Sequence, residues 1–219
     1  MTPQELFDTT LALLKKEENT SCILINEKAL GKKWNYSICA TPISIGKPLI
    51  IGINWGGGGA RDNFNYLVQD KMPTKEGFLK ELKDGDYKFL SLSKKYLKEH
   101  LNLDICSDEF NYSNLCFFRT PNIKYLKDED FKISIPILKK YVEELQPEYI
   151  LSLGNTNMKY LSVLNSDDIF FDHRTTENLK VNGYIGKLWS KEFYCLPHPS
   201  AHIHNTYRDE IWGKVFPKP

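Results

Sequence analysis

The chain has 219 residues, of which 41% are hydrophobic and 26% are charged, and its formal net charge is +1. This length can bury a core without help from metals or disulfides, and we expect one domain over residues 1–219. A charge so near zero excludes a surface that is basic throughout, so DNA could be bound only by a local patch. The candidates for such a patch, each otherwise an ordinary solvated surface residue, are Lys32, Lys33, Lys94, Lys95, Arg119, Lys124 and Arg208.

The five cysteines are odd in number and none forms a Cys-x-x-Cys pair, which argues against a disulfide framework and a zinc site. Cys116 and Cys195 lie within apolar runs, where cysteine usually acts as a small buried hydrophobic residue. No apolar stretch approaches the roughly 20 residues that span a bilayer. The charge order of residues 1–20 is that of a capped helix rather than of a secretory signal. We therefore expect a cytoplasmic protein without a membrane partner, and a monomer.

The first predicted element is a helix over residues 3–18, because Thr2 can cap it and Pro3 suits its first turn. Residues 19–48 carry mixed signals and predict a loop-rich approach to a buried strand at 49–53. A loop or short helix is expected next at 61–74. Two further helices are predicted, at residues 75–82 and 92–101.

In the second half of the chain, predicted strands alternate with predicted helices. Predicted strands cover residues 112–118, 149–153 and 192–196, and predicted helices cover 130–146, a short stretch from Thr156, and 203–216. Pro136 must kink the helix at 130–146 or mark its true start. Strands that alternate with helices predict an α/β protein, here a single three-layer α/β/α domain with a central, mostly parallel, four-stranded sheet.

Residues 48–61, PLIIGINWGGGGAR, are the most informative segment of the chain. Parallel strands buried on both faces read as apolar runs of this kind. Gly-rich turns at the carboxyl ends of such strands are where open α/β sheets bind their ligands. The segment therefore predicts the floor of a ligand site, with Asn54 at its edge.

Three polar residues at strand ends are expected to converge there. The first strand leads to Asn54, Asn114 lies at the second, and His198 follows the fourth. Each has a simpler reading, since Asn54 can accommodate a left-handed turn, Asn114 can cap a strand edge and His198 can be a rigid turn residue between prolines. Taken together, they would place two amides and an imidazole around a glycine-lined hollow.

This set of groups lacks a nucleophile paired with a base, because no Ser-His-Asp arrangement or Cys-His pair is suggested. It can instead place a water molecule and stabilise charge on a leaving group, since an imidazole or amide aimed at a developing oxyanion supplies several kcal/mol. Orienting a water suffices where the transition state is oxocarbenium-like and needs only a weak nucleophile, as in glycoside cleavage. A phosphate cradle is less well supported, because the glycines are not followed by Lys-Ser/Thr.

Three short motifs, in this order, resemble those of the uracil-DNA glycosylase superfamily. Gly52-Ile53-Asn54 followed by glycines is similar to the first motif in its mismatch-specific and single-strand-selective branches. Residues 114–122, NLCFFRTPN, are similar to the middle segment, and residues 196–200, LPHPS, resemble the His-Pro-Ser motif before the DNA-intercalating loop. Residues 149–155, YILSLGN, look like the third strand, and the resemblance covers residues 48–205.

The resemblance implies a role for each matched residue. Asn54 would position the attacking water, His198 would hydrogen-bond the pyrimidine O2, and Asn114 would read the base edge, since an amide both donates and accepts. Phe64 or Tyr66 would stack on the flipped base. The segment after the His-Pro-Ser turn would contact DNA or, alternatively, form a helix N-terminus packed on the body; it contains Ser200, His202, Ile203 and His204. Ile203 would be its apolar wedge, and Ser200 could instead cap the following helix.

The implied partner is DNA with a flipped pyrimidine, because the sugar–base bond is inaccessible within the stack. No metal or other cofactor is implied, since the cysteine spacings do not match the four-cysteine iron–sulfur site of some branches. The chain departs from the family pattern in having Trp55 where a proline is usual, with glycines continuing to Gly59. Gly56 and Gly57 would leave room beside the 5-position of the pyrimidine.

That room suggests a base with a bulky 5-substituent, such as a hydroxymethyl group or its sugar conjugate. The superfamily's anti-phage glycosylases, which excise glucosylated hydroxymethylcytosine, would need such room. A flexible loop that closes on ordinary uracil is the alternative, and repair and defence both stay open as roles. A catalytically silent relative that binds DNA or a modified nucleotide is a further alternative, although the presence of both Asn54 and His198 argues against it.

Overall fold

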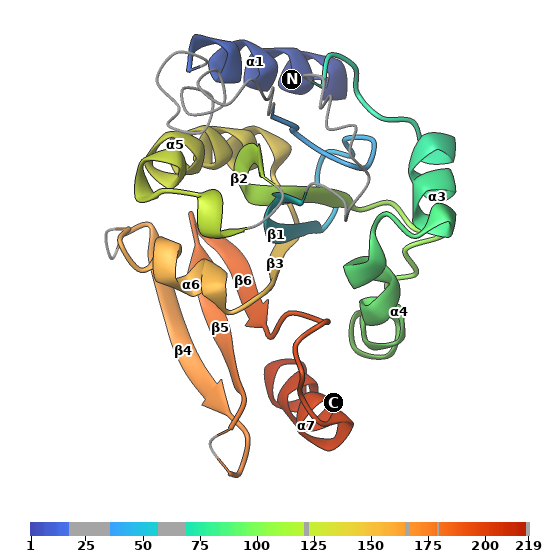
Figure 1. Ribbon diagram of the computed structural model, residues 1–219, viewed down its shortest axis with the longest axis vertical. Coiled ribbons are helices and arrows are strands. Elements are labelled where there is room, and N and C mark those ends of the chain that lie inside the picture. The colour runs from blue at the N-terminus through green and yellow to red at the C-terminus, as the bar shows by residue number, and fades with distance from the viewer. Residues whose placement is uncertain (18–35, 57–68, 121–122, 165–166, 179, 218–219) are drawn as a thin grey trace.

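The computed structural model describes residues 1–17, 36–56, 69–120, 123–164, 167–178 and 180–217. In this part of the chain a twisted six-stranded sheet has the order β2-β1-β3-β6-β5-β4 (Figure 1). The strands are β1 (Leu49–Gly56), β2 (Asn111–Thr120), β3 (Tyr149–Leu153), β4 (Ile169–Thr175), β5 (Asn182–Leu188) and β6 (Lys191–Leu196). β2, β1, β3 and β6 are parallel, whereas β5 and β4 are antiparallel additions beside β6.

The predicted α/β class with a mostly parallel sheet is confirmed, and the predicted count of four strands is wrong. The four apolar runs do form the parallel strands, with β3 at the predicted residues 149–153. The two strands that were missed, β4 and β5, carry mixed sequences, IFFDHRT and NGYIGKL, and most of their residues are partly exposed. A strand exposed on one face does not read as an apolar run, so the pattern that marks buried strands is missing from this hairpin.

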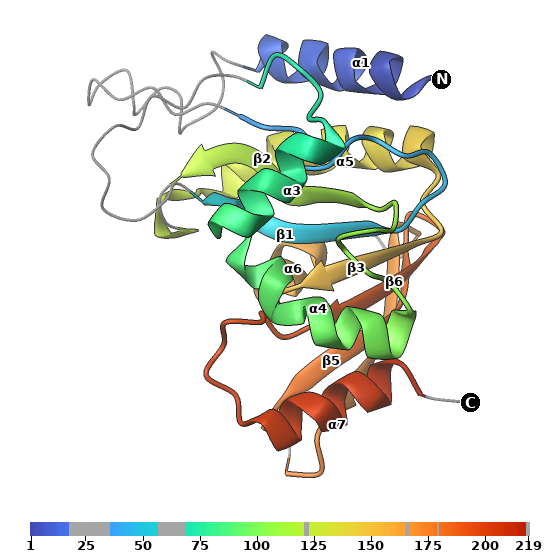
Figure 2. The same ribbon diagram turned by 90° about the vertical axis from the view of Figure 1, so that its right-hand side faces the viewer.

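Helices cover both faces of the sheet, which gives the three predicted layers (Figure 2). Buried side chains of α1 (Pro3–Lys16), α5 (Asp128–Leu145) and α6 (Thr156–Leu161) share one hydrophobic core cluster. Those of α3 (Lys75–Asp84), α4 (Lys88–Leu101) and α7 (Asn205–Val215) share the other cluster. Strand β1 contributes side chains to both clusters, because Leu49 and Ile51 point to the first and Ile50 points to the second.

The helix ends follow the local sequence signals. Thr2 caps α1 through a capping box, in which its hydroxyl accepts from the Glu5 backbone N–H and its own N–H donates to the Glu5 carboxylate. α5 begins at Asp128, so Pro136 does not mark its start and lies inside the helix. Pro136 is exposed. Its ring removes the N–H that would bond to the backbone carbonyl one turn earlier, and water can donate to that carbonyl instead. In the described residues no helix is both long and apolar enough to cross a membrane.

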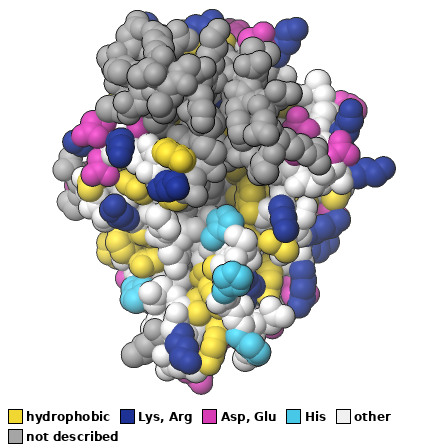
Figure 3. Space-filling view, viewed as in Figure 1, with side chains coloured by type: hydrophobic (Ala, Val, Ile, Leu, Met, Phe, Trp, Pro, Cys, Tyr) yellow, Lys and Arg dark blue, Asp and Glu magenta, His cyan; other side chains and the backbone are white. Residues whose placement is uncertain are grey.

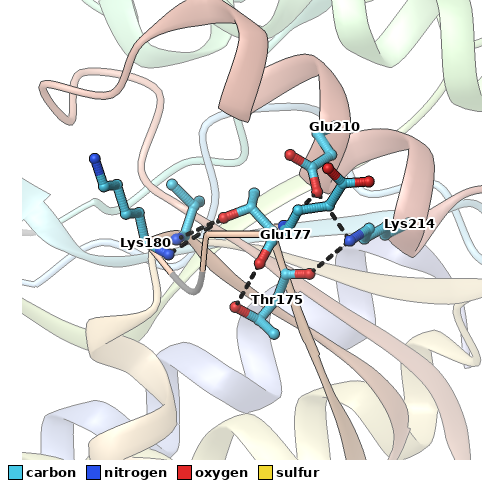
Figure 4. A network of polar contacts seen from close by, with 7 residues as sticks. Thr175, Glu177, Lys180, Glu210 and Lys214 are labelled. Carbon is cyan, nitrogen blue, oxygen red and sulfur yellow. Dashed lines mark hydrogen bonds and ion pairs between the residues drawn. The ribbon is translucent and has the colours of Figure 1, made fainter.

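The β4–β5 hairpin holds α7 in place through a polar network (Figure 4). Lys214 of α7 donates to the Thr175 carbonyl at 2.9 Å and forms an ion pair with Glu210 at 2.8 Å. Glu210 in turn accepts from the Glu177 backbone N–H at 2.7 Å. Because α7 directly follows residues 197–204, the added hairpin fixes the far end of that segment, which carries several of the predicted site residues.

Candidate active site

A cavity of about 650 Å³ opens at the carboxyl ends of β1 and β2. Asn54, Asn114 and His198, which sequence reasoning placed at strand ends, all line it. Asn114 lies within β2 rather than at its entry and is paired with Gly52 of β1. His198 reaches the same cavity from beyond β6, across the end of β3. The topology therefore brings together three residues that are up to 144 positions apart in the chain.

Asn54 stands at an irregularity in the pairing of β1 with β2. Asn54 is opposite Cys116, but the next residue, Trp55, is opposite Arg119, so the register shifts between Asn54 and Trp55. Such bulges bend a strand locally and change the direction of a side chain, and they are frequent beside active sites. Asn54 is half-buried at this point and lines the cavity.

Asn114 is almost fully buried, with 1% of its surface exposed. Its Oδ1 accepts a hydrogen bond from the Tyr112 hydroxyl at 3.2 Å. Gly52 faces the same oxygen, and a Cβ placed on Gly52 would come within 2.3 Å of it. The amide oxygen therefore occupies a niche that exists only because residue 52 has no side chain. The Asn114 Nδ2 is buried and has no hydrogen-bond partner among the described residues.

His198 is held by the serine of the same turn. The His198 Nδ1 is 2.7 Å from Ser200 Oγ and accepts from the Ser200 backbone N–H at 3.2 Å. An Nδ1 that accepts from an N–H carries no proton, so in the neutral ring the proton is on Nε2. The protein packed around the ring lowers the pKa of His198 by desolvation, and the positive charge of Arg208 lowers it further. Although the side chain is still exposed to the cavity, both effects favour the neutral imidazole.

The backbone beneath His198 depends on Gly154 at the end of β3. Its φ of +144° is one that side-chain-bearing residues rarely adopt. The Gly154 N–H donates to the Leu196 carbonyl at 2.8 Å, which ties the end of β3 to the end of β6. This contact places the turn that begins at Pro197 over the carboxyl edge of the sheet.

The opposite wall of the cavity comes from the α3–α4 junction, which sequence reasoning missed. It carries two carboxylates, one ammonium and two aromatic rings; the residues are Glu81, Asp86, Tyr87, Lys88 and Phe89. The Tyr87 hydroxyl donates to the Glu81 carboxylate at 2.7 Å, and the Phe89 ring centroid lies 6.2 Å from that of His198. These residues lie in α3, in the first turn of α4 and in the turn between the two helices rather than at a strand end, so the pattern of strand ends does not point to them.

Trp55 and Arg119 complete the lining. Trp55 is 5% exposed, and its ring packs edge-on against Tyr112 with centroids 5.3 Å apart. The Arg119 guanidinium lies 5.8 Å from the Trp55 ring and its Nε donates to Ser37 Oγ at 2.8 Å. Arg119, taken above as a candidate for a surface patch, is thus a half-buried cation at the cavity.

The segment after the His-Pro-Ser turn leads directly into α7. His202 and His204 are exposed, whereas Ile203 is half-buried and packs against the core cluster under α7. The N-cap of α7 is His204, whose Nδ1 accepts from the Thr206 backbone N–H, so Ser200 does not cap this helix. Arg208 fixes the segment by donating to the Ala201 carbonyl at 2.9 Å. Histidine side chains gather on this face, with lysines and arginines at its margins (Figure 3).

Several predicted residues lie outside the described part of the chain. These are Gly57, Phe64, Tyr66, Lys32 and Lys33. Gly56 is the last residue of β1.

The described residues do not fit a metal centre. They contain no group of three or more His, Cys, Asp or Glu side chains that could hold a metal ion. Cys39, Cys116 and Cys195 are each buried in the core, with Cys116 within β2 and Cys195 within β6. A four-cysteine cluster therefore has no site in this part of the chain.

The open, mostly parallel sheet with helices on both faces places the protein in the α/β class, and its polar cavity lies at the carboxyl edge, where such sheets commonly bind ligands. No protein-family model matches the chain. Among curated proteins, a type-4 uracil-DNA glycosylase from Sulfurisphaera tokodaii is 23% identical over 124 residues, which are 56% of this chain and 54% of that protein. The match spans about half the length of this relative. The likeness supports the uracil-DNA glycosylase superfamily and no particular branch of it.

Proposed function

We propose that the protein is a monofunctional DNA glycosylase that hydrolyses the bond between a flipped pyrimidine and its deoxyribose, leaving an abasic site. The observation that carries the proposal is the meeting of Asn54, Asn114 and His198 at one cavity. The distant likeness to a uracil-DNA glycosylase supports it.

The chemistry follows from the three groups. The bond between C1′ and N1 breaks and its electron pair leaves with the base, where the charge spreads onto O2. His198 donates from Nε2 to that oxygen, since its Nδ1 is already an acceptor for Ser200. A neutral donor aimed at developing charge stabilises the transition state by several kcal/mol. Asn54 orients the water that adds to C1′, and an oxocarbenium-like centre needs no stronger activation. The proton that this water loses passes through solvent to the departing base anion, so the products are the C1′ hydroxyl and the neutral base.

The DNA partner would be bound beside the cavity, along the segment that enters α7. Ser200, His202 and His204 offer groups for phosphate contacts, and Ile203 would be the apolar residue that fills the gap left by the flipped nucleotide. Extrusion costs a few kcal/mol, which such contacts offset. Ile203 is packed against the core in the structure, so the wedge role requires this segment to move outward on binding DNA.

The pyrimidine would carry a 5-substituent of some size, such as a hydroxymethyl group or its sugar conjugate. A cavity of about 650 Å³ is in the range of pockets that enclose a whole drug-sized ligand, which is larger than a pyrimidine base. Glu81 and Asp86 line its outer wall, and carboxylates accept hydrogen bonds from hydroxyl groups. Excision of ordinary uracil is the narrower form of the same proposal.

The direct test is base excision from oligonucleotides that carry uracil, 5-hydroxymethyluracil or glucosylated 5-hydroxymethylcytosine, with abasic sites revealed by alkaline cleavage. We expect Asn54→Ala and His198→Ala each to reduce the single-turnover rate by about 10²–10³-fold. His173→Ala is the matched control, because His173 is an exposed histidine of β4 that stacks on Tyr184 rather than lining the cavity.

DNA binding without abasic sites from any of these bases would refute the enzymatic proposal and favour a silent binding protein. Excision of uracil alone would refute the 5-substituent. Excision that survives both Asn54→Ala and His198→Ala would show that other groups do the chemistry.

A further inference from the structure

The pairing irregularity of β1 turns two successive side chains toward the same side of the sheet. Side chains of a strand point alternately to opposite faces; Ile51 lies in the first core cluster and Ile53 packs against it. Trp55 would follow them to that side, yet it belongs to the second cluster together with Ile50. The register shift between Asn54 and Trp55 accounts for this, since a bulge adds one residue and reverses the alternation beyond it. Asn54 and Trp55 therefore both line the cavity.

The indole of Trp55 is a buried donor without a partner. The residue is 5% exposed, and its Nε1 is buried and makes no hydrogen bond to the described residues. An indole N–H donates and cannot accept, and a buried donor that is left unpaired is unfavourable. Because Trp55 lines the cavity, a ligand bound there can supply the missing acceptor.

Arg119 places a positive charge beside this donor. It is opposite Trp55 in the pairing of β1 with β2, and its guanidinium lies 5.8 Å from the centre of the Trp55 ring. The charge also acts inside the cavity wall. Burial raises the pKa of Tyr112 well above its ordinary value, while the hydrogen bond to Asn114 and the charge of Arg119 both oppose this rise. A donor-only indole and a guanidinium, which is also a donor only, therefore share one wall.

The two walls of the cavity differ in what they can bind. Glu81 and Asp86 on the α3–α4 side are acceptors and are accompanied by Lys88, whereas Trp55 and Arg119 on the strand side offer donors only. A neutral hydroxyl group can bind to either wall, because it both donates and accepts. A negatively charged oxygen is repelled by carboxylates and forms strong, charge-assisted hydrogen bonds with a guanidinium. The strand side is therefore suited to an anionic oxygen.

We propose that Trp55 and Arg119 together bind an anionic oxygen group of the substrate, with the Trp55 N–H as the specificity-determining donor. The inference rests on the proposed function and adds a contact to it. Two parts of a DNA substrate carry such a group. One is a backbone phosphate beside the flipped nucleotide, and the other is an acidic 5-substituent, as in 5-carboxyuracil. The two sources share the same recognition chemistry, and the two arms of the test separate them.

The test measures binding of oligonucleotides that carry 2′-fluoro-2′-deoxyuridine, which resists cleavage, by the wild-type protein, Trp55→Phe and Trp189→Phe. In one arm the phosphate on the 5′ or 3′ side of this nucleotide is replaced by a neutral methylphosphonate. In the other arm its base carries a 5-carboxyl group or a neutral 5-hydroxymethyl group. Thermal unfolding verifies that the variants are folded.

Trp189→Phe is the matched control. Trp189 is 7% exposed, and its Nε1 is likewise buried without a partner among the described residues. It lies in the first core cluster and does not line the cavity. The same substitution there removes an unpaired indole N–H and the same volume of side chain, so effects of packing alone should appear in both variants.

We expect Trp55→Phe to weaken binding of the charged probe about 10-fold, the usual effect of losing one hydrogen bond to a charged group. Binding of the matching neutral probe should stay at the wild-type level. Arg119→Gln should show the same pattern, and it decides the outcome if Trp55→Phe does not fold. Trp189→Phe should bind every probe as the wild-type protein does. A selective loss in the methylphosphonate arm assigns the site to a backbone phosphate, and one in the carboxyl arm assigns it to an acidic 5-substituent.

The inference is overturned if Trp55→Phe weakens the charged and neutral probes equally, or weakens neither. It is also overturned if the wild-type protein binds charged and neutral probes equally in both arms. Excision of uracil is measured separately on cleavable oligonucleotides. A protein that excises uracil without this charge selectivity loses the inference and keeps the proposed function. A protein that binds the charged probes selectively but excises no base keeps the binding site and loses the proposed function.

Discussion

Gly52→Ala is the most direct perturbation of the base-reading group. The new Cβ would stand 2.3 Å from Asn114 Oδ1 and 3.2 Å from the Tyr112 hydroxyl oxygen, whereas ordinary contacts begin at 3.4 Å. The amide oxygen must therefore move by about 1 Å, and a displacement of that size in a positioned group can lower an enzyme's rate by about 10²-fold. Because the oxygen ends a side chain rather than belonging to the backbone, the stability loss should stay near 1–3 kcal/mol.

The assay is single-turnover excision of the best substrate at saturating enzyme, with urea unfolding measured on the same preparation. We expect an excision rate about 10²-fold below wild type in a protein that remains folded. Gly213→Ala in α7 is the control, because its Cβ would have no neighbour within 4 Å among the described residues. That change should leave the rate unaltered and raise stability by up to about 1 kcal/mol. A Gly52→Ala protein with a wild-type rate would refute the reasoning.

Three further outcomes follow from the contacts. Arg208→Gln removes the positive charge that helps to hold the pKa of His198 below its ordinary 6.5. The acid limb of the kcat/KM profile, expected below pH 6.5 in wild type, should therefore move to higher pH in this variant. An unmoved limb would contradict the assignment of His198. Thr2→Ala removes the α1 cap and should cost about 1 kcal/mol in urea unfolding without changing excision. Lys214→Met loses the hydrogen bond to the Thr175 carbonyl and the ion pair with Glu210. The free energy of unfolding should fall by at most about 1 kcal/mol, because the ion pair is partly exposed. A larger loss would contradict this small contribution of the polar network to stability.

Sequence patterns located the parallel core of the sheet because buried strands impose apolar runs. The runs ending near Asn54 and Leu153 lie in β1 and β3, and the residues that follow them stand at one edge. The β4–β5 hairpin escaped prediction since a partly exposed strand keeps polar residues, such as Asp172 and Arg174, along its length. Pro136 suggested a possible helix start that the structure does not have, because its exposed position lets α5 continue through it.

Local sequence alone determined the chemical groups of this protein. An apolar strand that ends in Asn54 and glycines, and a turn built from prolines around His198, are recognisable because short-range sterics and solvent exclusion restrict which residues can occupy those positions. Only the tertiary structure decided how these groups are oriented and what surrounds them. The niche of the Asn114 amide, the Phe89 ring beside His198 and the aromatic wall from the α3–α4 junction depend on packing between segments distant in the chain. Hydrogen bonds and steric contacts of that kind leave no periodic mark in the sequence, because each depends on where the other partner has been folded.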